Sequence, residues 1–543
     1  MMKKLISVLL IAAMVLSFAS CGSKNIVELD INSSGGKYAG KTVVVHSNDV
    51  HGAIEGYSYM AALKQSIESE GGTVILADDG DFSNGNIYVS ISKGDSAVTL
   101  MNEAGYDVVA LGNHEFDFGY DCLKENINHG TFKTICSNVY KDGKSIFDEN
   151  VIFKVGKMKI GFFALLSPQT QTKVNPSLVE GITFTADEDL YDAAQLQIDA
   201  LKAQKCDIII CLSHLGVDDE SAGNRSLDVI ENVEGIDFMI DGHSHTVMSY
   251  TAPDKENHEV PIQSTGAQFE NIGIIVIDNA TRQIESYELI PTENLERDEL
   301  VLAVAKNITE TVDDEFGAVF AKTLVDLDGE KDNIRTSETN LGDLITDAIF
   351  WSATNESELK VDNEHVVAIL NSGGIRASIT KGDISRSDIK TVLPFGNTIA
   401  VEYVTGEELL EVLEAGTFTT PESIGAFPQI SGMKIEIDTS KAYDAGEEYP
   451  DSTYCKPKTI NRVTILEVNG QPFDKDATYA VVTNDFCAAG GDTYYAFYRA
   501  YSEGNGFDTS IPTDETLVNY INSALGGEIG SEYAESQGRI IIK

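Results

Sequence analysis

Short runs of apolar residues that end in a polar side chain recur along the first half of the chain. One run, 107–111, predicts a buried strand, after which Gly112 turns the chain and Asn113 and His114 follow. Four more runs end in the same way: 43–45 before Asp49 and His51, 74–76 before Asp81, 208–210 before His214, and 238–240 before His243 and His245. Because open α/β sheets bind ligands at the carboxyl ends of their strands, we expect these side chains to lie together.

Taken singly, each of these polar residues is explained as the solvated end of a strand. Taken together they are harder to explain in that way, because they include five of the nine histidines of the chain. Carboxylate oxygens, amide oxygens and imidazole nitrogens are also the ligands that divalent transition metals bind in proteins. The pattern therefore predicts a metal or ligand site at the edge of a sheet.

From about residue 41 to 295, predicted helices and strands alternate. Apolar residues at helical spacing predict helices over 59–67, 96–104 and 193–203, and apolar runs predict further strands at 159–165 and 273–277. This alternation indicates a layered α/β domain. An amphipathic helix follows from about 297, with Val301, Ala305, Ile308 and Val312 on its apolar face, and we expect the segment 296–330 to connect to a second domain.

The second domain is expected over 331–543, because a chain of this length normally folds as more than one domain. In it, the predicted strand 366–370 leads into a turn with paired glycines, which let the backbone approach a ligand, and then into Arg376, whose guanidinium suits phosphate. An ordinary tight turn with a surface arginine is the alternative. Two further turns contain Phe395 and Phe486, which either sandwich a flat heterocycle, with Asp492 reaching sugar hydroxyls, or pack in the core.

The first residues follow a different pattern. Lys3 and Lys4 precede the apolar run 5–18, which is typical of an export signal and short for a membrane span. Cys21, after two small residues, resembles a bacterial lipobox, so we expect a lipoprotein signal peptide over 1–21 and a lipid on Cys21; an ordinary secretory signal is the alternative. Residues 22–40 are expected to form a flexible tether. The protein would then lie outside the cytoplasm, anchored to the cell membrane only through its lipid, or secreted.

Composition narrows the class of function. The chain has 39 Lys and Arg residues against 86 Asp and Glu residues, a net charge of -47 that argues against a nucleic-acid polymer or an anionic lipid surface as its partner. The same charge repels an anionic substrate unless a local positive cluster reverses it, which bound divalent metals do. The cysteines lack zinc-finger spacing: Cys206 and Cys211 fit a buried core, and the pairing of Cys122, Cys136, Cys455 and Cys487 stays open.

The polar strand ends form an ordered set that resembles the signature of calcineurin-type metallophosphoesterases: Asp49-Val50-His51, Gly80-Asp81, Gly112-Asn113-His114-Glu115, His214 and Gly242-His243-Ser244-His245. The second domain is similar to the nucleotide-binding domain of the secreted bacterial 5′-nucleotidase/UDP-sugar hydrolase family, through Thr339-Asn340-Leu341-Gly342, Gly373-Gly374-Ile375-Arg376, Pro394-Phe395-Gly396-Asn397 and Gly490-Gly491-Asp492. The resemblance implies an α/β protein of two domains: a four-layer α/β/β/α metallophosphoesterase domain over 41–295, a connecting helix over 296–330, and an α/β substrate-binding domain over 331–543.

The resemblance also implies a role for each residue of these motifs. One divalent ion (Zn, Mn or Co) would be held by Asp49, His51 and His245, a second by Asn113, His214 and His243, and Asp81 would bridge them. His114 and Asp117 would be the catalytic pair, with Asp117 orienting the imidazole, and Glu115 would be structural. The nucleotide would be bound by Phe395 and Phe486 at its base, Asp492 at its ribose, Arg335 and Arg376 at its phosphate, and Asn371 and Asn397 through hydrogen bonds.

The implied activity is hydrolysis of AMP and other nucleoside 5′-phosphates to nucleoside and phosphate by a metal-activated hydroxide, after a domain rotation that joins the two sites. Lys331 and Ser337 stand where relatives carry Arg, which leaves open whether ADP, ATP or UDP-sugars are also substrates. Two alternatives remain: a 2′,3′-cyclic-nucleotide 2′-phosphodiesterase/3′-nucleotidase, and a surface nucleotide-binding protein with an inactive site. The complete ligand set and the base-binding turns favour the nucleotidase.

Overall fold

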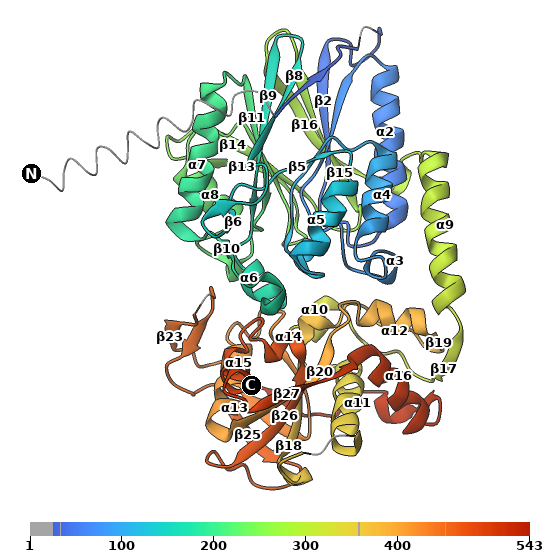
Figure 1. Ribbon diagram of the computed structural model, residues 1–543, viewed down its shortest axis with the longest axis vertical. Helices are drawn as coiled ribbons and strands as arrows, with labels where there is room; N and C mark the ends of the chain where they lie inside the picture. Colours follow the sequence, from blue (N-terminus) through green and yellow to red (C-terminus); the bar gives the residue numbers. More distant parts are fainter. Residues whose placement is uncertain (1–24, 33, 357–358, 451) are drawn as a thin grey trace, which may run out of the picture.

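In the computed structural model the chain forms two domains stacked along its long axis (Figure 1). The structure describes residues 25–32, 34–356, 359–450 and 452–543. The predicted signal peptide and Cys21 lie outside these residues. Within the described part, none of the helices combines the length and the apolar character needed to cross a membrane.

The N-terminal domain is built on two β-sheets that pack face to face. The six-stranded sheet has the order β16 (Gln283–Pro291), β15 (Asn271–Asp278), β2 (Lys41–Ser47), β3 (Thr73–Asp78), β4 (Val108–Val109) and β5 (Lys133–Thr134). The seven-stranded sheet has the order β1 (Ile26–Leu29), β8 (Asn150–Val155), β9 (Met158–Leu166), β11 (Ile208–His214), β12 (Phe238–Asp241), β14 (Glu259–Thr265) and β13 (Val247–Pro253). Branched side chains such as Val44 and Ile75 from one sheet and Ile210 from the other fill the space between them.

Helices cover the outer face of each sheet. The six-stranded sheet packs against α2 (Tyr57–Ser69) and α4 (Asp95–Ala104), and the seven-stranded sheet packs against α7 (Asp187–Ala203) and α8 (Ser226–Asn232) (Figure 1). The layers therefore follow the order helix, sheet, sheet, helix. This arrangement confirms the predicted four-layer α/β/β/α architecture, and the three helices predicted from apolar spacing are α2, α4 and α7.

The five strands predicted to end in polar residues are all present, as β2, β3, β4, β11 and β12. In one sheet β2, β3 and β4 run parallel, and in the other β11 and β12 run parallel. Polar residues that follow β3, β4 and β12 line a cavity shared with the C-terminal domain: Asp81, Asn113, His114, His243 and His245. Both sheets thus present their carboxyl ends toward the same region, as the sequence pattern predicted.

The expectation of a flexible tether over 22–40 is wrong for part of that segment. Strand β1 pairs in parallel with β8, with Ile26 opposite Ile152 and Leu29 opposite Val155. The apolar side chains of Val27 and Leu29 pack against the core between the two sheets. Since this alternation of apolar residues buries one face of the segment, it forms an edge strand instead of a solvated linker.

The predicted connecting segment contains a shorter helix than expected, α9 (Glu299–Phe316). Asp298 caps its start by accepting hydrogen bonds from the backbone N–H groups of Leu300 and Val301. Val301 and Ala305 pack on the helices of the N-terminal domain, so α9 lies along that domain and ends near the next one (Figure 1). After it, β17 (Val319–Thr323) already pairs with β19 (Gly382–Ser385) of the C-terminal domain.

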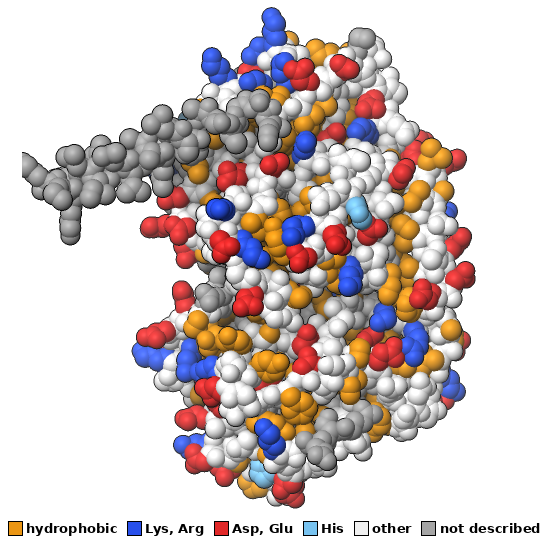
Figure 2. Space-filling view, viewed as in Figure 1, with side chains coloured by type: hydrophobic (Ala, Val, Ile, Leu, Met, Phe, Trp, Pro, Cys, Tyr) orange, Lys and Arg blue, Asp and Glu red, His pale blue; other side chains and the backbone are white. Residues whose placement is uncertain are grey.

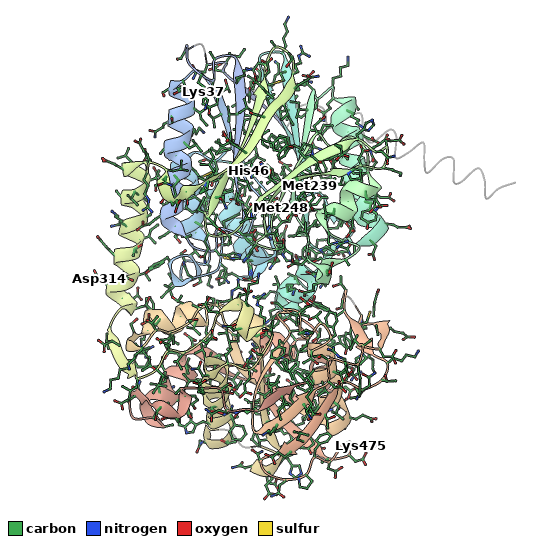
Figure 3. The ribbon with its side chains drawn as sticks, turned by 180° about the vertical axis from the view of Figure 1, so that it is seen from behind. Lys37, His46, Met239, Met248, Asp314 and Lys475 are labelled. Atoms are coloured by element: carbon green, nitrogen blue, oxygen red, sulfur yellow. The ribbon has the colours of Figure 1, made fainter. Side chains whose placement is uncertain are left out.

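The C-terminal domain has a central five-stranded sheet with helices on both faces. Its order is β21 (Pro428–Ser431), β18 (Val366–Asn371), β26 (Thr478–Asn484), β20 (Thr398–Thr405) and β27 (Gly506–Pro512). One face packs against α11 (Asn340–Glu356) and α16 (Thr513–Ser523), and the other against α13 (Gly406–Gly416) and α15 (Tyr495–Ser502). Seen from behind, Asp314 lies near the lower end of α9 and Lys475 lies on the C-terminal domain far from the N-terminal one (Figure 3).

The described surface carries mixed charge. On the face shown in Figure 2, acidic side chains are spread over both domains, with lysine and arginine between them and no single-sign patch. The six cysteines of the described residues are unpaired, so Cys122, Cys136, Cys455 and Cys487 form no disulfides with one another in this structure. The predicted core residue Cys211 is fully buried, and Cys206 is partly buried.

Candidate active site

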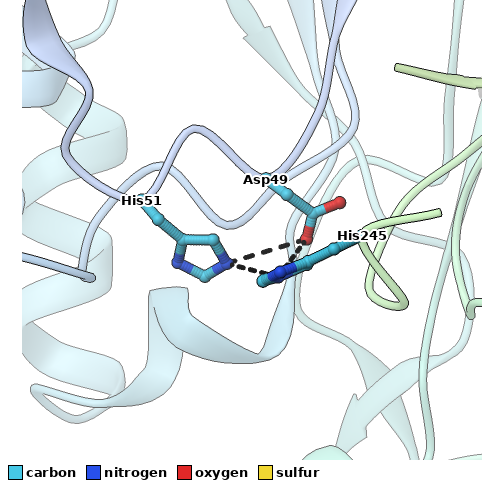
Figure 4. A group of neighbouring side chains, drawn as sticks. All are labelled: Asp49, His51 and His245. Carbon is cyan, nitrogen blue, oxygen red and sulfur yellow. Dashed lines mark hydrogen bonds and ion pairs between the residues drawn. The ribbon is translucent and has the colours of Figure 1, made fainter. Parts of the chain in front are cut away.

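The first group of predicted metal ligands comes together in one place. Asp49 and His51 lie in the loop after β2, and His245 lies in the loop after β12; their side chains point toward one another (Figure 4). The Nε2 atoms of the two histidines are 2.9 Å apart. The Oδ1 atom of Asp49 lies 3.8 Å from Nε2 of His51 and 3.5 Å from Nε2 of His245. Three donor atoms this close, two of them imidazole nitrogens facing each other, fit a shared cation.

The second group lies beside the first and shares Asp81 with it. The Oδ2 atom of Asp81 is 3.1 Å from Nε2 of His214 and 3.6 Å from Nε2 of His51, so this carboxylate lies between the two groups. The Nδ1 atom of His243 lies 2.8 Å from the amide oxygen of Asn113. All seven predicted ligands therefore contribute to one cluster, with Asp81 in the bridging position.

The backbone at this cluster is strained in the way that functional loops often are. Five of the predicted ligands have positive φ angles, which side-chain-bearing residues rarely adopt: Asp49 (51°), His51 (45°), Asp81 (61°), His243 (73°) and His245 (58°). Gly80, at φ 89°, allows the close approach of the neighbouring loop, because a Cβ atom there would lie 2.3 Å from the backbone nitrogen of Gly112.

Hydrogen bonds fix how two of the imidazoles face the cluster. The Nδ1 atom of His51 lies 3.0 Å from the carbonyl oxygen of Asn84, and the Nδ1 atom of His214 lies 2.5 Å from the carbonyl oxygen of Asp79. Since a carbonyl oxygen only accepts, each Nδ1 carries a proton, which leaves Nε2 as the nitrogen that faces the cluster. That is the arrangement of histidines that ligate metals.

Burial sets the protonation states of the cluster. It lowers the pKa of His51 and of His243 to about 3, so both are neutral at physiological pH. Burial alone would raise the pKa of Asp81, but the neighbouring His214 and His114 hold it well below its ordinary value. Burial disfavours the charged form of His214, but Asp81 and the other carboxylates outweigh it and raise the pKa of His214. His214 must therefore give up a proton when a metal binds, whereas His51 and His243 are already neutral.

His114 and Asp117 form the pair expected from the sequence. They lie at the short 3-10 helix Asn113–Phe116, and Nδ1 of His114 lies 2.6 Å from Oδ2 of Asp117. Burial disfavours the charged imidazole, but the carboxylates of Asp117 and Asp81 outweigh it and raise the pKa of His114. The Glu115 carboxylate accepts hydrogen bonds from the backbone N–H groups of Asp81, Phe82, Ser83 and Gly112, a structural role.

A cavity of about 530 Å³ lies between the domains, with residues of the predicted metal-ligand cluster on one side. The seven residues predicted to bind substrate all line its other side: Arg335, Asn371, Arg376, Phe395, Asn397, Phe486 and Asp492. Burial and the neighbouring Arg335 lower the pKa of Arg376, but only to about 10, so its guanidinium stays charged at neutral pH. Lys331 lines the cavity as well. Cations from the C-terminal domain therefore face the cluster, with room for a ligand between them.

The two phenylalanines differ in their surroundings. Phe395 is half-buried, and its ring stacks on the imidazole of His114, with ring centroids 5.7 Å apart. Phe486 is buried and belongs to the core of the C-terminal domain, with one edge on the cavity. Phe395 thus lies in the domain interface, whereas the core interpretation holds in part for Phe486.

The sequence pattern missed a group of side chains at the domain interface. Gln169, Lys173 and Glu220 of the N-terminal domain line the cavity beside Asp492, and Lys173 lies 3.7 Å from its carboxylate. The strand before Gln169 was predicted, but the turn after it has no Asp or His among its first residues, which was the signal used for the other strands. Only the proximity of the C-terminal domain identifies this turn as part of the site.

Two family models match the two domains of the chain. Residues 42–247 match the family model of the calcineurin-like phosphoesterases, and residues 319–499 match that of the 5′-nucleotidase C-terminal domain. A trifunctional nucleotide phosphoesterase of Bacillus subtilis is 29% identical over 90% of this chain, which spans only 34% of that longer protein. The 5′-nucleotidase of Vibrio parahaemolyticus is 27% identical over 99% of this chain and 96% of its own length.

Solved structures show the same arrangement of domains. The 5′-nucleotidase precursor from Thermus thermophilus superposes with a TM-score of 0.76 at 26% sequence identity, over 92% of this chain and 99% of that one. This likeness extends over both domains.

Proposed function

The chain belongs to the calcineurin-like phosphoesterases that carry a 5′-nucleotidase C-terminal domain, a family of metal-dependent phosphoester hydrolases, and from this premise we propose that it hydrolyses nucleoside 5′-monophosphates to nucleoside and phosphate. The observation that carries the proposal is the cavity between the domains. On one side of it are residues of the proposed metal-ligand cluster, and on the other are cationic, aromatic and amide side chains suited to the phosphate, base and sugar of a nucleotide.

Seven side chains would hold two divalent ions, with Asp49, His51 and His245 at one, Asn113, His214 and His243 at the other, and Asp81 between them. When bound, such ions neutralise phosphoryl charge and make water acidic enough to attack at neutral pH. Oxygen and nitrogen donors of this kind suit Zn, Mn or Co.

The phosphate group would be oriented by Arg335 and Arg376. Guanidinium groups bind phosphate oxygens through paired hydrogen bonds, and both side chains line the cavity opposite the cluster. Lys331 adds a third cation, which supports ADP, ATP and UDP-sugars as further substrates to be tested.

His114 would act on the phosphoryl group or on the leaving 5′-oxygen. Asp117 holds its Nδ1 atom at 2.6 Å and favours the charged imidazolium. That imidazolium stabilises negative charge on the phosphoryl group or gives a proton to the leaving 5′-oxygen. Phe395 and Phe486 would contact the base, Asn371 and Asn397 would donate or accept hydrogen bonds, and Asp492 would bind the ribose hydroxyls.

Phosphate release from AMP tests the proposal. We expect the chain without residues 1–21, supplied with Mn²⁺, to release phosphate, and Asp81→Asn and His114→Ala each to lose about 10²–10⁴-fold in kcat. Release from 2′,3′-cyclic AMP but not from AMP would move the assignment to the cyclic-nucleotide phosphodiesterases. Retention of AMP without release from either substrate would leave a nucleotide-binding protein.

We also propose that the protein works outside the cytoplasm with a lipid on Cys21. The support is the sequence of the first 21 residues alone: two lysines, an apolar run and small residues before the cysteine. In a bacterial host, Cys21→Ala should lose incorporation of labelled fatty acid and shift the protein into the medium. Unlabelled wild-type protein in the medium would favour the ordinary secretory signal.

A further inference from the structure

Three imidazoles of the cluster are held through the nitrogen that faces away from it, but by different kinds of partner. Backbone carbonyl groups hold His51 and His214. The third, His243, has its Nε2 atom 3.1 Å from Oε1 of Gln169. The side chain of Gln169 therefore does for His243 what backbone carbonyl groups do for the other two histidines. Gln169 lies on the segment 167–175 between the domains.

The amide of Gln169 has a fixed orientation. Its Nε2 group donates to the carbonyl oxygen of Glu220 at 3.2 Å, and its Oε1 atom accepts from the hydroxyl of Ser221 at 3.1 Å. The two imidazole nitrogens of His243 thus both face amide oxygens, which only accept: Oε1 of Gln169 at Nε2 and Oδ1 of Asn113 at Nδ1. A cation bound between Nδ1 and Asn113 would leave the proton of this neutral imidazole on Nε2, where Gln169 accepts it. Gln169 is only 2% exposed, so water cannot readily take over this contact.

The other end of the same segment contacts the C-terminal domain. The short helix α6 (Thr170–Lys173) places Nζ of Lys173 2.5 Å from Oε1 of Glu220 and 3.7 Å from Oδ1 of Asp492. The hydroxyl of Tyr454 donates to the same Glu220 oxygen at 2.5 Å. The backbone N–H of Asp492 donates to the carbonyl of Thr172 at 2.7 Å. One segment thus touches a proposed metal ligand at one end and the proposed ribose-binding residue at the other.

Charge makes the contact with Asp492 depend on the position of the C-terminal domain. Burial disfavours the charged form of Lys173, but Glu220 and Asp492 outweigh it and raise its pKa. If the domains separate, Asp492 and Tyr454 move away with the C-terminal domain, and the Lys173–Glu220 pair loses its contacts with both residues. Because Glu220 also accepts from Gln169 through its backbone, a change at Lys173 reaches the amide that holds His243.

We propose that the segment 167–175 couples the metal cluster to the nucleotide pocket: Gln169 is a positioning residue for His243, and Lys173, paired with Glu220, holds Asp492 when the domains close on a nucleoside. This rests on the proposed function, which gives His243 and Asp492 their roles. Coupling between binding sites is reciprocal. A nucleoside that binds the pocket therefore tightens metal binding, and metal tightens nucleoside binding.

The affinity for metal in the absence of nucleotide tests whether Gln169 positions His243. We expect Gln169→Ala to bind Mn²⁺ about 10–100-fold more weakly than the wild type, as loss of a partner that orients a ligand histidine usually does. Gln171→Ala is the matched control, because Gln171 is half-buried on the same short helix and makes no side-chain hydrogen bond within the described residues. Titration calorimetry on the metal-stripped protein gives the dissociation constants, and thermal unfolding confirms that each variant folds.

The affinity for metal with and without adenosine tests whether Lys173 couples the nucleotide pocket to the metal cluster. In the wild type, saturating adenosine should tighten Mn²⁺ binding by a factor of about 5–150. In Lys173→Met, which keeps the stem and loses the charge, the ratio of the Mn²⁺ affinities measured with and without adenosine should fall to near one.

The outcomes separate this inference from the proposed function. Wild-type Mn²⁺ affinity in Gln169→Ala, no effect of adenosine on the wild type, or an undiminished effect in Lys173→Met would each overturn the coupling. A wild type that does not hydrolyse AMP contradicts the proposed function instead, because the Gln169→Ala titration contains no nucleotide and involves no turnover.

Discussion

The ring of Phe395, from the C-terminal domain, stacks on the imidazole of His114, from the N-terminal domain, with centroids 5.7 Å apart and ring planes inclined by 26°. The guanidinium of Arg376 lies 5.8 Å from the same ring centroid. One aromatic side chain therefore contacts the proposed catalytic histidine and a proposed phosphate ligand at once. A nucleotide base that stacks on Phe395 is brought close to both.

This position predicts the effect of removing the ring. Phe395→Ala should raise KM for AMP about 10–100-fold, because stacking of a base on an aromatic side chain contributes about 1–3 kcal/mol. Phe395→Tyr keeps the ring and should stay near wild type. Steady-state kinetics on AMP distinguish the two, and an unchanged KM in Phe395→Ala would show that the base binds elsewhere.

The contact between His114 and Asp117 predicts a loss of rate with little loss of binding. Asp117→Asn keeps the shape of the side chain but removes the charge that favours the imidazolium. We expect kcat for AMP to fall about 10²–10⁴-fold, the usual contribution of a general acid, with a smaller change in KM. Asp121→Asn, at an exposed carboxylate in the first turn of α5 (Tyr120–His129), is the control and should match the wild type. If Asp117→Asn and Asp121→Asn had equal kcat values for AMP, the proposed role of the His114–Asp117 pair would be contradicted.

Removal of metal should destabilise the N-terminal domain as well as abolish activity. Without a cation, buried carboxylates such as Asp49, whose pKa burial raises to about 6, face one another in the cluster. A ligand that binds only the folded state at 100 times its dissociation constant adds about 2.7 kcal/mol. Calorimetric melting with EDTA should therefore show a lower Tm, restored by Mn²⁺. Asp81→Asn should show a much smaller Mn²⁺-dependent shift; a full shift would place the metal elsewhere.

A buried glutamate in the C-terminal domain predicts a pH dependence of stability. Glu402, on β20, is fully buried, neither of its carboxylate oxygens has a hydrogen-bond partner among the described residues, and burial raises its pKa from 4.5 to about 9. Between these two values the folded state keeps a proton that the unfolded state loses. The free energy of unfolding therefore falls as pH rises through this window.

Glu402→Gln has no proton to lose, so its stability should fall less between about pH 5.5 and pH 8 than that of the wild type. Urea unfolding at both values measures the difference. Glu407→Gln, at an exposed position in the first turn of α13, is the matched control and should follow the wild type. A parallel decline in Glu402→Gln and the wild type would show that another group causes the dependence.

The convergence of the proposed metal ligands was predictable because each part of the cluster is local in sequence. An apolar run that ends in Asp, Asn or His marks both the strand and its functional end, and parallel strands bring such ends together. Asp49, Asn113 and His214, which follow or end three different strands, lie within one cluster for this reason. Arg376 and Phe395 were identified through their glycine-containing turns and the family resemblance, and both line the cavity.

What the sequence could not supply depends on packing between distant segments. Gln169 and Lys173 look like ordinary loop residues until the C-terminal domain brings Asp492 and Tyr454 beside them. Likewise, Val27 and Leu29 form a strand only because the edge of the seven-stranded sheet is open to them. The stacking of Phe395 on His114 also joins two domains, which no pattern within either segment encodes.

The cluster draws its ligands from both sheets of the N-terminal domain, and this has a consequence for the order of events during synthesis. His51 and His245, whose nitrogens lie 2.9 Å apart, are 194 positions apart in the sequence. A nascent chain that has not yet produced β12 has only part of the coordination set, however well its first sheet has folded. Complete metal uptake must therefore follow the docking of the two sheets. Bound ions would stabilise the domain after it has folded and would not nucleate its folding.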